Sequence, residues 1–256
     1  MMLKRALYAE TLKLKRTLAL KMVVLAPLAV LALTIFMAAS APFSTLRRGN
    51  NTDGWGALAR VNFQFWGMLM MPLYITLQTA LIAALDHSEN QWKAILARPL
   101  PRWTIYLAKL LIVMALTAAA SAVLACGILL SGVILRQLTS EVRFAFPAPF
   151  TNILRQIAQM TGLAFLSLTI QLWVSLRWRA FSVAVGFGIV AAVTTFAMLL
   201  SSGPYRSWPQ YYPWALPMLV LARQPHDTAA ALCIGAAIGI LAAIAGCLDF
   251  CRREVA

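Results

Sequence analysis

The sequence predicts an all-α polytopic membrane protein with six transmembrane helices. The chain is 61% hydrophobic and 12% charged, with a mean hydropathy of +0.77, whereas a soluble domain carries about 25% charged residues. Its apolar stretches approach or exceed the roughly 20 residues that a helix needs to cross the hydrocarbon. Because lipid offers no hydrogen-bond partners, each stretch is expected to satisfy its own backbone as a helix.

The six expected spans are separated by polar connections too short to hold a soluble domain. We therefore expect residues 1–256 to form a single transmembrane domain. The spans are expected at about Met22–Ala39, Phe63–Leu85, Ile105–Leu135, Ile157–Leu176, Phe181–Leu200 and Thr228–Leu248.

The basic residues predict the orientation of the chain. Most of the 22 Lys and Arg residues fall before the first span, around the connection after the second, after the fourth and after the last. This is the positive-inside pattern for a protein with both termini in the cytoplasm, as in a bacterial inner membrane. The formal net charge of +14 is therefore expected to face membrane lipid rather than nucleic acid.

Residues 2–20 are expected to form an amphipathic interfacial helix. Leu3, Leu7, Leu14 and Leu18 fall in one stripe at helical spacing, and most of the basic residues fall on the opposite side. Such a helix suits the anionic inner leaflet.

Glu10 borders that apolar stripe, away from most of the basic side. Two interpretations remain open from the residues alone. Glu10 is either a local partner for Lys13 or a contact with a cytoplasmic protein.

The connection between the second and third spans predicts a short, rigid cytoplasmic helix. Asp86 with Glu89, or Ser88 with Gln91, can form a capping box. The helix is expected to end before Pro99, because the residue before a proline is pushed out of the helical region. It either rests on the headgroups or docks a partner, and its stiffness favours docking.

The fourth span carries the most polar face. Ser167, Gln171 and Ser175 recur every four residues and share one side of a helix. Polar groups in lipid face protein or a watery cavity. These three side chains therefore either bond neighbouring helices or line a transport pathway.

The connection between the fifth and sixth spans contains five prolines, which rule out a regular span, and predicts outer re-entrant segments. The last span then carries Gly235, Gly239 and Gly246. Small residues at this spacing favour close helix packing.

No catalytic, cofactor-binding or metal site is expected. No span has an ionisable residue near its middle, which argues against an ion-coupled carrier or an intramembrane enzyme. No phosphate-binding GxxxxGK[ST] loop is present. The four cysteines lack the spacing of a zinc site. If the chain moves a substrate, a separate subunit must supply the energy.

Three segments resemble type-2 ABC exporter permeases, particularly the lantibiotic-immunity and bacitracin-resistance-like group. They are "YAETLKLKRTLALKMVVLAPLAV", "ALDHSENQWKAILARPLPRWTIYLAKLL" and "YYPWALPMLVL". The resemblance implies a permease subunit that pairs with a second permease, identical or homologous, and with two ABC ATPase subunits. Family members export peptides, drugs, lipids or polysaccharides, and some confer antibiotic resistance.

The resemblance also implies which positions contact the ATPase and which form the outer re-entrant helices. The re-entrant helices match 211–222. The contact positions are Glu10, Lys13, Glu89, Trp92, Lys93, Arg98, Pro99 and Arg102.

Two other classes of function are alternatives to the exporter permease. One is a membrane scaffold or assembly protein that transports nothing. The other is a membrane-embedded enzyme, for which only Asp53, Glu141, His226 and Asp227 stand in the outer loops.

Overall fold

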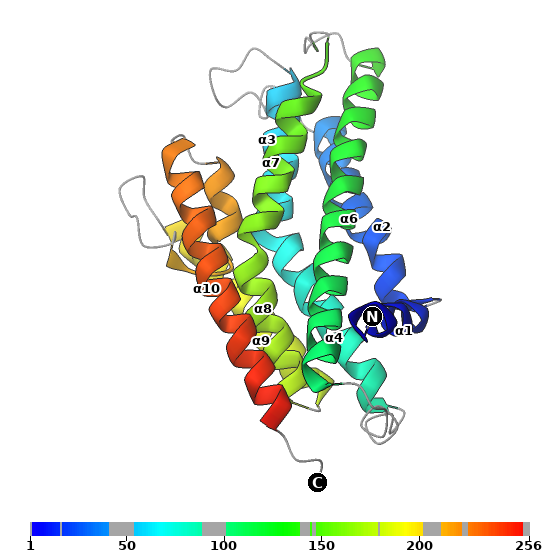
Figure 1. Cartoon of the computed structure of the whole chain (residues 1–256). Coiled ribbons are helices and arrows are strands. Elements are labelled where there is room, and N and C mark those ends of the chain that lie inside the picture. Colours follow the sequence, from blue (N-terminus) through cyan, green and yellow to red (C-terminus); the bar gives the residue numbers. More distant parts are fainter. Residues whose placement is uncertain are drawn as a thin grey trace.

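The computed structural model describes residues 2–15, 17–40, 54–88, 101–138, 144, 147–178, 180–201, 211–221 and 225–252. Every regular element in these ranges is helical, which confirms the predicted all-α fold (Figure 1). Within the same ranges, five helices are long and apolar enough to cross a membrane, and a bent pair makes a sixth if it counts as one span. The chain is a polytopic membrane protein.

The first two helices differ in role and direction. Helix α1 (Met2–Leu14) lies crosswise near the lower end of the bundle in Figure 1, and α2 (Leu18–Ser40) forms the first span. The Thr17 hydroxyl donates to the Leu14 carbonyl at 2.7 Å, which satisfies a carbonyl that the end of α1 leaves without a helical partner. The interfacial helix therefore ends at Leu14 instead of running to residue 20 as expected. We call this end of the bundle the α1 end.

The second span is part of a longer helical run. Helices α3 (Gly54–Phe65) and α4 (Met71–Ser88) are joined through a π-helical turn, η2 (Trp66–Met70). The expected span began only at Phe63, because glycines and polar residues upstream favoured a loop. The structure is helical from Gly54, since Trp55 is buried and its ring packs edge-on against Phe144, with centroids 5.3 Å apart.

The third and fourth spans differ in regularity. Helix α6 (Arg102–Leu138) is a continuous rod of 37 residues. Helices α7 (Phe150–Leu163) and α8 (Phe165–Arg177) meet at an angle of 41°, so the fourth span is broken rather than a single helix as expected. No proline marks the break. It lies at Ala164, and it lets α7 pack on α6 while α8 packs on α4 and α10.

The last two spans lie on the outside of the bundle. Helix α9 (Phe181–Ser201) and helix α10 (Pro225–Arg252) bury 28% and 17% of their most apolar windows, against 56% for the α3–α4 run. A short 3-10 helix, η4 (Leu216–Leu221), packs on α7 and α10 in the expected re-entrant region. Helix α10 begins at Pro225, upstream of the expected Thr228, and proline is well suited to a first helical position.

Candidate functional site

A buried carboxylate joins the interfacial helix to the third span. Glu10 of α1 accepts a 2.8 Å hydrogen bond from Lys13 through one carboxylate oxygen and a 2.8 Å bond from Lys109 of α6 through the other. The Glu10 side chain is 10% exposed and that of Lys109 is 0% exposed. The sequence left open whether Glu10 pairs locally or contacts a partner. In the folded chain its carboxylate is turned toward the bundle.

Glu10 lies at the centre of the buried face of α1. Ala6, Glu10 and Leu14, each one turn apart, are the buried residues of the helix. The expected leucine stripe is only partly matched, because Leu3 is half-buried and Leu18 is 50% exposed at the start of α2. The face that packs on α6 is centred on a charged residue instead of leucines.

Two further polar contacts hold helices together at the α1 end. Arg102 at the start of α6 donates to the backbone carbonyl of Cys251 near the end of α10, at 3.2 Å. The carboxylate of Asp249 on α10 accepts from the Trp173 indole at 3.1 Å and from Arg177 at 3.4 Å, both on α8. The start of α6 and the ends of α8 and α10 are therefore fixed to one another by polar groups.

Arg102 is one of the predicted coupling residues, and the structure places it at the α1 end together with Glu10 and Lys13. The remaining predicted coupling residues lie outside the described residues: Glu89, Trp92, Lys93, Arg98 and Pro99. Helix α4 continues through Ser88, so Asp86 still belongs to the helix of the second span and does not begin a new one.

The polar face of α8 is buried between helices. The Ser175 hydroxyl donates to Thr79 of α4 at 3.0 Å, and the Gln171 amide donates to the Ala184 carbonyl of α9 at 2.9 Å. Ser167 bonds the Ala164 carbonyl at the helix break. Within one chain these side chains make helix contacts, and their lining of a transport pathway stays a prediction.

The three glycines of α10 meet different neighbours. A Cβ built on Gly246 would lie 2.5 Å from the Tyr106 hydroxyl, and one on Gly239 would lie 2.6 Å from the Phe165 ring. One on Gly235 would make an ordinary contact, at 3.6 Å from Leu216. Helix α10 therefore packs more closely at Gly239 and Gly246 than at Gly235.

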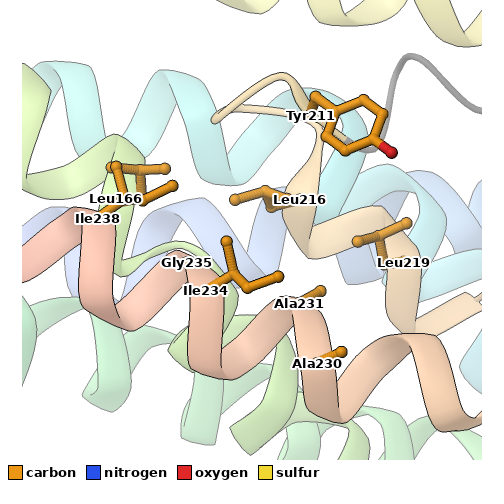
Figure 2. A pocket seen from close by; sticks show the side chains of 9 residues that line it. All are labelled: Leu166, Tyr211, Leu216, Leu219, Ala230, Ala231, Ile234, Gly235 and Ile238. Atoms are coloured by element: carbon orange, nitrogen blue, oxygen red, sulfur yellow. The ribbon is translucent and has the colours of Figure 1, made fainter.

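An apolar cavity of about 240 Å³ lies beside Gly235. Figure 2 shows its walls, which come from α10, η4 and the first turn of α8, with Tyr211 at one side. Its lining residues are Leu166, Tyr211, Leu216, Leu219, Ala230, Ala231, Ile234, Gly235 and Ile238.

Tyr212 connects the segment before η4 to α9. Its hydroxyl donates to the Ala191 carbonyl at 3.3 Å, and its ring packs against that of Trp214, with centroids 5.5 Å apart. Burial raises the pKa of Tyr212 above its ordinary value of 10.0.

Sequence reasoning missed the roles of two residues. Lys109 had the pattern of an interfacial lysine, yet it is fully buried on Glu10. Gln78, in the middle of an apolar run, donates to the Ala19 carbonyl at 2.7 Å and so ties α4 to the start of α2. A polar residue inside an apolar run was the available signal for both. Among the described residues, no group of His, Cys, Asp and Glu could hold a metal ion.

The comparison with protein families gives one informative result. Residues 6–195 match a family model described as ABC-2 family transporter protein. The match covers α1 through most of α9, including Glu10, Lys109 and the polar face of α8. Comparison with curated proteins gives no match.

Proposed function

The chain belongs to the ABC-2 transporter family, and on that premise we propose that it is the permease of an exporter whose α1 end faces the ATPase. A chain of this family is a membrane permease subunit without a nucleotide-binding site of its own, and its partner is an ABC ATPase. The proposal adds a direction of transport, an orientation and a docking face to those statements.

The observation that carries the proposal is the clustering of charge at the α1 end. Glu10 pairs with Lys109 there, Arg177 pairs with Asp249, and Arg102 donates to the Cys251 carbonyl. Basic residues near membrane boundaries favour the cytoplasmic side. An ATPase is a soluble cytoplasmic protein, so this end is the one that it can reach.

In this arrangement α1 and the segment 89–102 form the docking face. The segment follows α4 directly and leads into α6 at Arg102. Glu89, Trp92 and Lys93 supply an acidic, an aromatic and a basic group within one turn of the predicted short helix. Aromatic residues surrounded by polar groups are typical anchors of protein interfaces.

The complete exporter would contain two permease subunits, identical or homologous, and two ATPase subunits. The resemblance to lantibiotic-immunity and bacitracin-resistance-like permeases supports an antimicrobial peptide, a drug or a lipid as the substrate. That substrate would make the chain an antibiotic-resistance determinant of a bacterial inner membrane with both termini in the cytoplasm.

Co-purification tests the docking face. Tagged permease is extracted from its native membranes in a mild detergent, and the ATPase recovered with it is quantified. Glu89→Lys combined with Trp92→Ala is expected to lower recovery about tenfold, because interface anchors carry most of the binding energy. Arg155→Glu, an exposed position on α7, is the matched charge-reversal control. Equal recovery with both variants would overturn the docking role, and no ATPase with the wild-type chain would overturn the exporter itself.

Cysteine labelling tests the orientation. In a background without the native Cys126, Cys233, Cys247 and Cys251, Thr11→Cys on α1 and Thr151→Cys on α7 are treated with a membrane-impermeant maleimide. Both positions are exposed. Thr151→Cys is expected to react in intact cells, and Thr11→Cys only after lysis. The reverse pattern would place the α1 end outside the cell, where no ATPase could bind.

Gene deletion tests the substrate class. The deletion strain is expected to become more sensitive to at least one toxic peptide or drug in a panel, and the plasmid-borne gene is expected to restore resistance. A membrane scaffold with no transport role would leave every sensitivity unchanged while the chain still recovered its partner.

A further inference from the structure

Helix α1 is too short to be stable alone and depends on its contacts with the rest of the chain. It has 13 residues, and isolated helices of this length are marginal even with favourable sequences. Its contacts with the rest of the chain are made chiefly with α6. The contact contains only two buried apolar residues from α1, Ala6 and Leu14, and Glu10 lies between them.

The pair at the centre of this contact is suited to fixing a position. A buried ion pair adds little stability compared with apolar residues of the same size, because both charges lose their hydration. Its better-attested effect is to select one register between helices. Glu10 has this geometry, with one carboxylate oxygen 2.8 Å from Lys13 on its own helix and the other 2.8 Å from Lys109 on α6.

Lys109 lies close to the point where α6 begins. It follows Arg102 by seven residues, which is about 10 Å along a helix. The segment 89–102, which the proposed function places against the ATPase, leads directly into this part of α6. Both proposed docking elements therefore converge on the first two turns of one transmembrane helix.

We propose that the Glu10–Lys109 ion pair makes α1 and the beginning of α6 a single rigid unit, so that ATPase movement reaches α6 through α1 as well as through 89–102. The inference rests on the proposed function. Glu10 and Lys109 are positioning residues in it, and Glu10 acts on the ATPase only through the helix that it fixes. Lys4 and Arg5 on the exposed side of α1 can meet a partner or the headgroups.

The experiment tests whether the ion pair fixes the position of α1 along α6 or only attaches one helix to the other. Glu10→Leu with Lys109→Met replaces the ion pair by apolar side chains, which is expected to preserve the thermal unfolding temperature. Glu10→Gln removes one charge only. Asp249→Asn is the control, because it removes a charge at the same end without touching α1.

The first readout is the distance between α1 and the far end of α6. Spin labels at Thr11→Cys and Ile134→Cys, both exposed, are placed in a chain without its native cysteines and diluted with unlabelled subunits. The labels are expected to lie roughly 40 Å apart, because α6 rises about 1.5 Å per residue from Lys109 to Ile134. The distance distribution is expected to be narrow in the wild type and in Asp249→Asn, and broad in both Glu10 variants.

The second readout is the movement of α6 that ATP binding and hydrolysis by the ATPase produce. In the complex with its ATPase, a fluorescent probe at Ile134→Cys is expected to change its accessibility to a quencher when ATP and vanadate trap the ATPase. The change is expected to fall about three- to tenfold in both Glu10 variants, which lies within the roughly two- to thirtyfold range by which residues between two sites alter coupling. The ATPase is expected to stay bound, and the control is expected to keep the full change.

The outcomes distinguish the two levels of the proposal. If the apolar pair transmits the ATP-driven change as the wild type does, the ion pair serves attachment alone and the inference is wrong, although the exporter assignment stands. If the wild-type chain binds no ATPase, the proposed function fails. The distance distributions of the permease alone still report whether Glu10 and Lys109 fix α1 to α6.

Discussion

Different kinds of contact hold the helices together at the two ends of the bundle. At the α1 end, charged and polar side chains bridge the helices, as in Glu10–Lys109 and Arg177–Asp249. At the opposite end, η4 and the start of α10 line a partly open apolar cavity of about 240 Å³, and Tyr212 donates a hydrogen bond to the Ala191 carbonyl of α9. Among the described residues, the three ion pairs all lie at the α1 end. In the part of the chain that the structure describes, the ion pairs are therefore concentrated at the α1 end, whereas the cavity at the opposite end is lined mainly by apolar side chains.

The largest effect is expected from removing one partner of the buried pair. Lys109→Met leaves the Glu10 carboxylate next to Lys13 but without its partner on α6. We expect a loss of about 2 kcal/mol in the free energy of unfolding, because the nearly buried carboxylate keeps Lys13 but loses one of its two charge-assisted hydrogen bonds. Denaturant titration in detergent micelles measures it. A loss no larger than that of a surface mutation would remove the contrast between the two ends.

Glycine substitutions on α10 compare the two ends within one helix. Gly246→Ala places a Cβ 2.5 Å from the hydroxyl of the buried Tyr106, and we expect it to cost about 1–3 kcal/mol. Gly235→Ala meets only Leu216, at 3.6 Å, and is expected to be neutral or slightly stabilising, because the new Cβ makes an ordinary contact and alanine favours the helix. Thermal unfolding of both variants in the same detergent gives the comparison. Equal melting temperatures would show that α10 packs alike along its length.

The hydrogen bond of Tyr212 tests the opposite end. Tyr212→Phe is expected to cost about 1 kcal/mol near neutral pH. Because burial raises the pKa of Tyr212 in the folded chain, the folded state keeps its proton longer than the unfolded state does. The phenol's contribution is therefore present below pH 10.0 and is lost as the pH rises further. Unfolding titrations at several alkaline pH values are expected to fall less steeply for the variant than for the wild type.

The smallest effect is expected at the surface pair. Arg177 is 50% exposed, so water screens its interaction with Asp249. Arg177→Gln is expected to cost below about 1 kcal/mol, since exposed ion pairs contribute little. The same denaturant titration measures it. A cost equal to that of Lys109→Met would mean that burial does not distinguish the two pairs.

The sequence alone was sufficient to predict the features that depend on the composition of a single segment. The helical class and the approximate positions of the apolar spans follow from hydropathy, because lipid imposes the same requirement on every spanning segment. The helix ends were less predictable. Residues 54–62 fall in the connection that was expected between the first two spans, yet Trp55 is buried and Asn62 bonds the Leu58 carbonyl and Thr34.

Features that depend on contacts between distant segments could not be predicted. Glu10 and Lys109 are 99 residues apart in the sequence, and either alone is an ordinary interfacial residue. The break at Ala164 has no proline to signal it, and the two helices differ in their main neighbours, which are α6 and η4 for α7 and α10 and α4 for α8. Serine and glutamine on one face of α8 predicted a polar contact, but the partners Thr79 and Ala184 are known only from the fold.

The unbroken length of α6 has a mechanical consequence. Its 37 residues span about 55 Å, which exceeds the roughly 30 Å of the hydrocarbon layer. A stiff lever of that length converts a tilt of about 5° at its base into a displacement of about 5 Å at its tip. A tilt of a few degrees at the α1 end can thus shift the opposite end of α6 by more than the diameter of a water molecule.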